Sequence, residues 1–181
     1  MSLATLKKIV ISGGPGVGKT TTIQELQKIN YATIPEAFSV LYQEAQEKEN
    51  LDIFCTDRTQ LHHQVFEKQC ALEKLHEDKT VILCDRSAVD IIGFTSYYKN
   101  HMSDHFFDAI AQHRYNLVFF LDPLPIHLYQ NSDIRRESWH TSLIIHDHIK
   151  KGYEQLNYEL INVPFGTIQD RLDFILNHLH V

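Results

Sequence analysis

The chain has 181 residues, of which 43% are hydrophobic and 22% are charged, a composition that favours one globular domain over residues 1–181. A formal net charge of -6 argues against bulk attraction to nucleic acid, and no run of about 18 apolar residues could span a membrane. Residues 1–8 contain no long apolar core and the three cysteines are scattered, so we expect a reduced, cytoplasmic setting.

Short apolar runs alternate with helical segments along the whole chain. The sequence predicts strands at residues 7–12, 31–35, 80–84, 116–121 and 159–163. It predicts helices at residues 18–29, 38–47, 56–77, 87–98, 103–113, 140–158 and, behind a capping box of Thr167 and Asp170, up to about residue 178. Residues 126–138 are polar and irregular. This alternation indicates an α/β fold whose parallel sheet is covered by helices on both faces.

Apolar residues share one face in two of the predicted helices: Ile23, Leu26 and Ile29 in the first, and Leu61, Val65, Leu72 and Leu75 in the third.

One stretch matches G-x-x-x-x-G-K-[ST], the phosphate-binding loop of P-loop NTPases: Gly13-Gly14-Pro15-Gly16-Val17-Gly18-Lys19-Thr20. Glycines let the backbone N–H groups approach the phosphates, and the following helix directs its positive dipole end at the anion. Lys19 can then reach the β- and γ-phosphates, and the Thr20 hydroxyl can bind Mg²⁺. The alternative is a chance glycine turn, but the loop lies between an apolar run and a predicted helix, as the motif requires. The sequence therefore predicts a site for ATP and Mg²⁺ that includes these residues and Thr21.

Polar residues follow the other strands at the carboxyl end, where parallel sheets bind ligands: Glu36, Asp85-Arg86 and Asp122. Asp85 is predicted to hold Mg²⁺ opposite Thr20, the alternative being an acid that only stabilises a helix N-terminus. Arg86 is predicted to face the phosphates or the substrate, the alternative being a surface ion pair. Glu36 is predicted to be the general base that takes a proton from a substrate hydroxyl, rather than a solvated acid.

Further candidates have two open interpretations each. Arg135 and Arg136 precede a helix, and at least one of them is predicted to close over the γ-phosphate, the alternative being a solvated basic pair. Asp90 could serve the site or complete a capping box with Ser87, and Asp122 could line the site or end its strand. Three polar residues of the third helix, which could read a substrate, more simply belong to the core or the surface: Arg58, Gln60 and Gln64.

With these residues in place, the chain resembles the nicotinamide-riboside-kinase-like "AAA domain" family of small P-loop proteins, kin to deoxynucleoside and nucleoside monophosphate kinases. The matching features are Gly13 to Thr20, Pro35-Glu36-Ala37, Asp85-Arg86-Ser87 with Asp90, Asp122-Pro123, Arg135 before a helix, and Val163-Pro164 with Arg171. The resemblance implies a three-layer P-loop fold with strand order 2-3-1-4-5 and a lid at about residues 124–140. It also implies that the adenine lies near the loop after strand five, at Pro164. In the kin kinases, an acid after strand two is the base, and an Asp/Glu-Arg pair serves Mg²⁺ and phosphate.

Two functions from different classes fit this sequence. The first is a magnesium- and ATP-dependent kinase of a small nucleoside- or nucleotide-like acceptor with a free hydroxyl, favoured by Glu36, Arg86 and the lid arginines. The second is a nucleotide-binding regulatory module with slow hydrolysis and a protein or lipid partner, because no substrate-reading motif is evident. A guanine-specific switch is disfavoured, since the sequence has no Asn-Lys-x-Asp motif.

Overall fold

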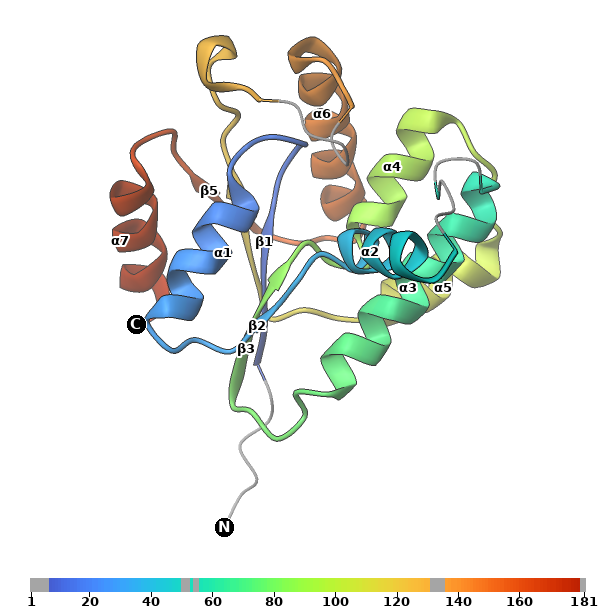
Figure 1. The fold of residues 1–181 in the computed structure, drawn as a ribbon, viewed down its shortest axis with the longest axis horizontal. Coiled ribbons are helices and arrows are strands. Elements are labelled where there is room, and N and C mark those ends of the chain that lie inside the picture. Colours follow the sequence, from blue (N-terminus) through green and yellow to red (C-terminus); the bar gives the residue numbers. More distant parts are fainter. Residues whose placement is uncertain (1–6, 50–52, 54–55, 131–135, 180–181) are drawn as a thin grey trace.

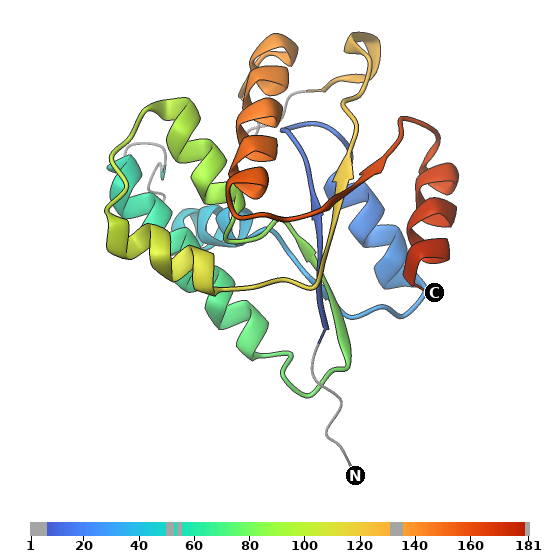
Figure 2. The same cartoon turned by 180° about the vertical axis from the view of Figure 1, so that it is seen from behind.

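The computed structural model of the chain describes residues 7–49, 53, 56–130 and 136–179. Within these residues, five parallel strands form one sheet between two layers of helices (Figures 1 and 2). The strands are β1 (Lys7–Ser12), β2 (Thr33–Ile34), β3 (Val81–Asp85), β4 (Leu117–Leu121) and β5 (Leu160–Val163). The helices are α1 (Lys19–Lys28), α2 (Ala37–Glu49), α3 (Arg58–Lys74), α4 (Asp90–Tyr98), α5 (Asp104–Gln112), α6 (Trp139–Gln155) and α7 (Ile168–Leu179).

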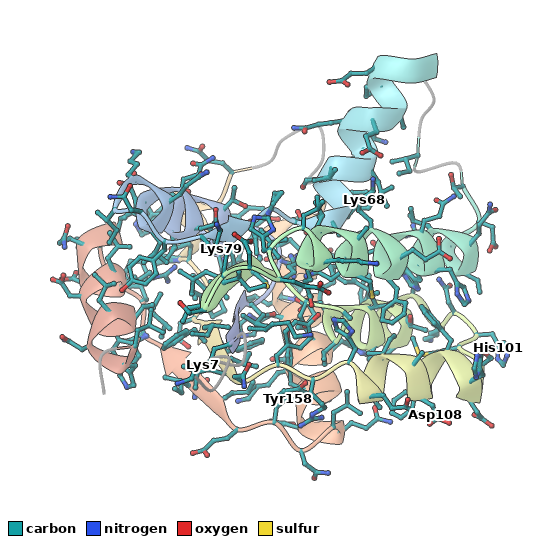
Figure 3. All side chains as sticks on the ribbon, turned by 90° about the horizontal axis from the view of Figure 1, so that it is seen from below. Lys7, Lys68, Lys79, His101, Asp108 and Tyr158 are labelled. Atoms are coloured by element: carbon teal, nitrogen blue, oxygen red, sulfur yellow. The ribbon has the colours of Figure 1, made fainter. Side chains whose placement is uncertain are left out.

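The strand order is β2-β3-β1-β4-β5, which confirms the predicted P-loop kinase-like sheet. β1 lies in the middle, where Ile9 pairs with Leu83 of β3 on one side and with Leu117 of β4 on the other. Strands β1 and β3 begin side by side, near Lys7 and Lys79 at the amino end of the sheet (Figure 3). All the carboxyl ends therefore meet at the opposite edge, which is where the phosphate loop begins.

Alternation along the strands divides the apolar residues between two cores, one on each face of the sheet. Ile9 and Ile11 of β1 pack against α1 and α7, together with Leu26 and Ile175. Val10 faces the other way and belongs to the core beneath α4, α5 and α6. The two-sided burial explains why the strands read as continuous apolar runs. In the described residues, no helix is both long and apolar enough to cross a membrane.

The structure corrects several predicted boundaries. The third helix is Arg58–Lys74 rather than 56–77, so Leu75 lies beyond its last turn and is 75% exposed. Ile29 follows α1 in the same way and is also exposed, because an apolar residue past a helix end no longer shares the buried face. The second strand shortens from 31–35 to two residues, and α2 continues to Glu49 rather than ending at residue 47.

Two further corrections concern the segments nearest the site. Helix α4 begins at Asp90 rather than Ser87, and only half of the predicted capping box is present. The Ser87 N–H donates to Asp90, whereas the Ser87 hydroxyl accepts from the N–H of Val89. The predicted irregular stretch 126–138 contains one turn of 3₁₀ helix, η2 (Ile126–Leu128). The last capping box has both its predicted bonds, since Thr167 and Asp170 each accept the other's backbone N–H.

Candidate functional site

The phosphate loop joins β1 to α1 in a conformation that needs glycine. Gly13, Gly16 and Gly18 have φ angles of 139°, 77° and 92°, the left-handed region that favours glycine. Gly16 also lies under the ring of Tyr129, where an added Cβ would come within 2.2 Å of a ring carbon. Gly18 is the N-cap of α1, so the loop ends at the positive end of that helix.

Two residues that are distant in the sequence form hydrogen bonds with the backbone of this loop. The Gly14 N–H donates to His146 Nδ1 over 3.0 Å, from a position 132 residues away. Arg171, 2% exposed, donates to the carbonyl of Val17, 154 residues away, and to that of Asp122 at 3.0 Å. Sequence reasoning did not single out His146 and named Arg171 only as a family feature, because no local pattern reports contacts across such separations.

Lys19, Thr20 and Asp85 meet at the start of α1. The Lys19 ammonium donates to the Gly14 carbonyl at 2.7 Å, and the Thr20 hydroxyl donates to Asp85 Oδ2 at 2.7 Å. Burial, followed by the nearby cation of Arg86, lowers the pKa of Lys19 to about 7. A bound polyphosphate would reverse this shift, because an adjacent anion favours the charged ammonium.

The donor set here fits Mg²⁺, the ion that P-loop phosphoryl transfer uses. Asp85 is 2% exposed, and its Oδ1 has no hydrogen-bond partner among the described residues. Burial, and then the negative charge of Glu36, raises the pKa of Asp85 to about 6. A buried carboxylate oxygen without a partner, beside a threonine hydroxyl, offers the hard oxygen ligands that Mg²⁺ prefers.

Arg86 is the centre of a buried ion network. Its Nε donates to Glu36 Oε1 at 2.6 Å, and its Nη1 donates to Asp90 Oδ1 at 3.0 Å and to the Gly13 carbonyl at 2.9 Å. The residue itself has a φ of 69°, which turns the chain immediately after β3. Burial alone would raise the pKa of Glu36, but the Arg86 and Lys19 cations outweigh it and the net shift is downward.

Asp90 holds this network in place from behind. It is 2% exposed and also accepts from the Ser12 hydroxyl at 2.7 Å and from the Tyr153 hydroxyl. Tyr153 comes from α6, the helix that carries His146, so one helix contacts both the phosphate loop and the arginine network. Glycines inside α4 and α6 were the sequence signal that could have indicated how closely these two helices pack. An added Cβ on Gly93 would lie 2.4 Å from the backbone of Ile149.

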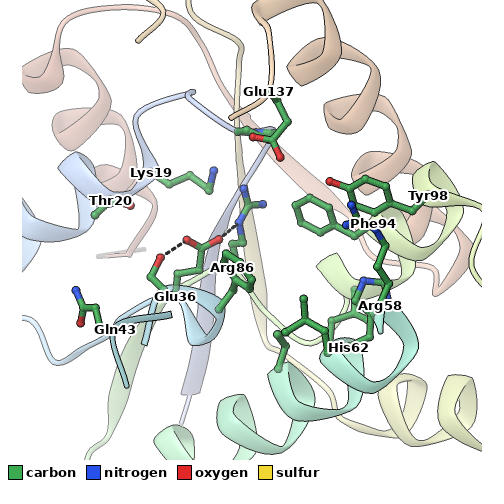
Figure 4. Close-up of a pocket in the computed structure, with 16 residues that line it drawn as sticks. Lys19, Thr20, Glu36, Gln43, Arg58, His62, Arg86, Phe94, Tyr98 and Glu137 are labelled. Atoms are coloured by element: carbon green, nitrogen blue, oxygen red, sulfur yellow. Dashed lines mark hydrogen bonds and ion pairs between the residues drawn. The ribbon is translucent and has the colours of Figure 1, made fainter. Parts of the chain in front are cut away.

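A cavity of about 380 Å³ opens beside these groups (Figure 4). Its polar end is lined by Lys19, Thr20, Glu36, Ser39, Gln43 and Arg86. Its walls are mostly apolar, formed by Phe38, Leu61, Val65, Ile91 and Phe94. Arg58, His62 and Tyr98 also line the cavity, and Figure 4 shows Arg58 and Tyr98 across it from Lys19 and Thr20, with Glu137 between the two sides. The volume is in the range of small-molecule sites.

Most of the remaining predicted residues that the structure describes do not line this cavity. Arg135 falls outside the described residues, and Arg136 is exposed. Pro164 is exposed directly after β5, and Thr21 is exposed on α1. Asp122 is half-buried, with its N–H on the Val163 carbonyl. Of the three candidates on α3, only Arg58 lines the cavity; Gln60 is exposed and Gln64 is half-buried.

Family comparison agrees with this geometry. Residues 8–171 match the model of an AAA domain family. The chain belongs to this AAA domain family. No curated protein matches it in sequence.

Solved structures with the same fold include several nucleotide-binding proteins. NadR protein, in complex with NAD and AMP-PNP, aligns with a TM-score of 0.70 and 16% identity over 98% of this chain. The chain spans only 50% of NadR's length. Deoxyadenosine kinase from M. mycoides, with dCMP and dCDP bound, aligns with a TM-score of 0.67 and 16% identity over 96% of this chain and 98% of its own. Thymidylate kinase from Ehrlichia chaffeensis aligns with a TM-score of 0.65 and 14% identity over 97% of this chain and 99% of its own. Identities this low show a shared kinase-like fold.

Proposed function

We propose that this AAA domain protein is an ATP-dependent phosphotransferase that moves the γ-phosphoryl group to a hydroxyl of a small nucleoside- or nucleotide-like acceptor. One observation carries the proposal: a carboxylate that can take a proton, Glu36, opens into the same cavity as Lys19 and Thr20 of the phosphate loop. A binding module needs the loop but has no use for a base beside it. The kinases and NadR among the structural relatives support the same function.

Each residue then has a separate task. The loop N–H groups and Lys19 hold the β- and γ-phosphates, while Glu36 orients the acceptor hydroxyl and accepts its proton. The acceptor oxygen forms the new bond to phosphorus, the bond to the bridging oxygen breaks, and ADP leaves. Arg86 keeps Glu36 ionised and in position. Thr20 and Asp85 would hold Mg²⁺, which neutralises charge on the phosphates.

In this proposal, residues 1–181 form one domain, and the segment at residues 124–140 is its lid. Its described parts are tied together, since Trp139 Nε1 donates to the Leu124 carbonyl at 2.9 Å and the Tyr129 hydroxyl donates to the Glu137 carbonyl at 2.8 Å. Tyr129 also packs on Gly16 of the phosphate loop. We assign Arg135 and Arg136 to the phosphates and Pro164 to the adenine.

The test is ADP release with and without a panel of nucleosides and nucleotides. Glu36→Gln should lower transfer to the acceptor about 10²–10⁴-fold, the usual worth of a general base, and leave ATP affinity nearly unchanged. Hydrolysis by water should fall much less. Glu44→Gln is the matched control, because Glu44 of α2 is, like Glu36, a carboxylate paired with a cation, Lys68 at 2.8 Å, yet lies outside the cavity lining.

One outcome would contradict the proposed function, and another would contradict only the role of Glu36. In the first, no acceptor raises ADP release above the rate with water, which would favour a regulatory module with a protein or lipid partner. In the second, Glu36→Gln transfers as well as the wild type, which would leave the kinase function standing but remove Glu36 as its base.

A further inference from the structure

Away from the cavity, three side chains join a thiol, an imidazole and a carboxylate in one row. Cys70 and Glu73 lie one turn apart on α3, and His113 directly follows α5, which packs beside α3 (Figures 1 and 2). The His113 ring bridges the other two, with Nδ1 3.9 Å from Cys70 Sγ and Nε2 2.8 Å from Glu73 Oε2. A carboxylate that orients an imidazole, which in turn contacts a thiol, is the arrangement of an activated nucleophile.

The charges around this row leave a surplus cation beside the thiol. Lys8 Nζ donates to the same Glu73 oxygen at 2.9 Å and lies 3.1 Å from His113 Nε2. The hydrogen bonds with Cys70 and Glu73 raise the pKa of His113 to about 9, so its ring is charged at neutral pH. The remaining hydrogen-bond partners of Glu73 are the uncharged side chains of Gln69 and Tyr115. Two cations therefore share one carboxylate, and a thiolate at Cys70 would balance the charge that is left.

The other cysteine that the structure describes differs from Cys70 in exposure. Cys84 lies inside β3 and is 0% exposed, and burial raises its pKa well above the ordinary value. Cys70 is half-buried and so keeps contact with solvent. Reactive cysteines are partly exposed and lie near positive charge, whereas cysteines buried in apolar surroundings are inert. Cys84 is therefore an unreactive reference within the same chain.

We propose that Cys70 is a site of oxidation by small hydroperoxides, with the His113 imidazolium stabilising its thiolate. This inference goes beyond the proposed phosphotransferase and does not depend on it. The sulfur attacks one peroxide oxygen, so an S–O bond forms as the O–O bond breaks. The leaving hydroxide takes the Nδ1 proton of His113 and departs as water. Sulfur is thereby oxidised by two electrons to the sulfenic acid, and the peroxide is reduced.

The experiment uses the full chain with Cys55→Ser, which leaves Cys70 and Cys84 as its two thiols. The protein is treated with hydrogen peroxide and with dimedone, which traps sulfenic acids, and peptide mass spectrometry measures each cysteine separately. At pH 7, Cys70 should be labelled at least about 10-fold faster than Cys84. Labelling of Cys70 that is no faster than that of Cys84 would overturn the proposal.

His113→Gln tests the role of the imidazolium in the same background. At pH 7 the variant should be labelled at Cys70 about 10-fold more slowly, because the cation beside the sulfur is lost. At pH 10 the wild-type ring is itself neutral, so the two proteins should be labelled at similar rates. His76→Gln is the matched control, because that imidazole contacts the Leu72 carbonyl, and it should leave both rates unchanged.

A loss of stability in His113→Gln would not produce the same result. Partial unfolding exposes Cys84 and speeds labelling at both thiols, whereas the proposal expects slower labelling of Cys70 and no change at Cys84. If His113→Gln does not fold, Lys8→Gln removes the other cation and should also slow Cys70 alone. Unchanged labelling of Cys70 at pH 7 in a folded variant, or a difference from wild type that persists at pH 10 in His113→Gln, would overturn the proposal.

Discussion

Two buried carboxylates, Asp85 and Glu73, lie at opposite ends of the same sheet and differ in how fully their oxygens are used. Glu73 is on α3, beside the amino ends of the strands, and is 5% exposed. Its Oε1 accepts from Gln69 and Tyr115, and its Oε2 accepts from Lys8 and His113, all at 2.8–2.9 Å. Asp85, 2% exposed at the carboxyl end of β3, accepts one bond from Thr20 and leaves Oδ1 without a described partner.

The pKa values show the consequence of this difference. Burial would raise the pKa of both carboxyl groups. For Glu73 the hydrogen bonds from His113 and Gln69 outweigh burial and lower the pKa to about 2, whereas for Asp85 burial prevails and the pKa rises to about 6. A buried carboxylate whose oxygens all accept hydrogen bonds stabilises the packing of the elements that it joins. A buried carboxylate with an oxygen that has no partner can still bind a ligand. On this comparison, changes at Glu73 should affect stability and changes near Asp85 should affect nucleotide binding.

The largest effect is expected for Glu73→Ala. It would leave Lys8, His113 and Tyr115 without their shared acceptor, and breaking a buried ion pair typically costs about 3–5 kcal/mol. Urea unfolding measures the loss, and calorimetry should find ATP affinity unchanged, because neither Glu73 nor these partners line the cavity. Glu67→Ala, an exposed glutamate on the same helix, is the control. A loss below about 1 kcal/mol would contradict the role of Glu73 as a fastening group.

Lys19→Ala should weaken ATP binding and leave stability unchanged, which is the converse of the result expected for Glu73→Ala. The change removes the cation directed at the β- and γ-phosphates, and ATP affinity should fall roughly 100-fold or more as charge-assisted bonds are lost. Stability should not fall, since burial already disfavours the charged form of Lys19. Calorimetry and thermal unfolding measure the two effects. Lys28→Ala, at the exposed end of the same helix, should leave affinity unchanged. Unaltered ATP binding in Lys19→Ala would show that the loop does not bind phosphate.

The contrast between the phosphate loop and the Glu73 cluster also explains how much of the fold and of the candidate site could be predicted from the sequence. The phosphate loop was evident because its glycines and Lys19 are contiguous, and the sheet followed from apolar runs and the family resemblance. Asp85 and Arg86 were found because they end a strand. The hydrogen-bonded cluster around Glu73 was missed, since Lys8, Glu73 and His113 are joined only when β1, α3 and the end of α5 pack together. His146 was missed for the same reason.

The pH dependence of stability provides a second test of the Glu73 cluster. His113 is hydrogen-bonded to Cys70 and Glu73, which raises its pKa to about 9, above the value near 6.5 for an unfolded chain. Its contribution is therefore complete below pH 6.5 and is lost as the pH rises through 9. Glu73, with its lowered pKa, contributes fully above about pH 4.5 and loses its effect as the pH falls through 2.

The free energies of unfolding of wild type and of His113→Gln should therefore converge in alkaline solution. Between pH 6.5 and 9.5, the free energy of unfolding of wild type should fall by on the order of 2 kcal/mol more than that of the variant. Urea unfolding at intervals of one pH unit gives this difference, and other groups cancel because both proteins contain them. A constant difference over this range would mean that His113 does not carry its charge in the folded protein.

The smallest expected effect concerns His146, which connects α6 to the phosphate loop by accepting a hydrogen bond from a loop N–H. Burial is the main reason that its pKa is lowered to about 4, so the ring is neutral and Nδ1 accepts from Gly14 at 3.0 Å. His146→Leu would leave a buried N–H without an acceptor and allow the loop to shift. An unmade buried hydrogen bond costs about 1–3 kcal/mol, so the KM for ATP should rise roughly 10-fold.

His146→Asn separates this positioning role from simple packing. An asparagine oxygen can accept the Gly14 N–H, so the KM for ATP should return to within about 3-fold of wild type, although both variants lose the contact of the imidazole with the Phe120 ring. Both variants should therefore lose similar thermal stability while only His146→Leu binds ATP poorly. Equal KM values for the two variants would assign His146 to packing alone. A selective rescue by asparagine would show that the geometry of the loop depends on a helix that also holds Asp90 through Tyr153, which links the nucleotide side of the cavity to the arginine network on its acceptor side.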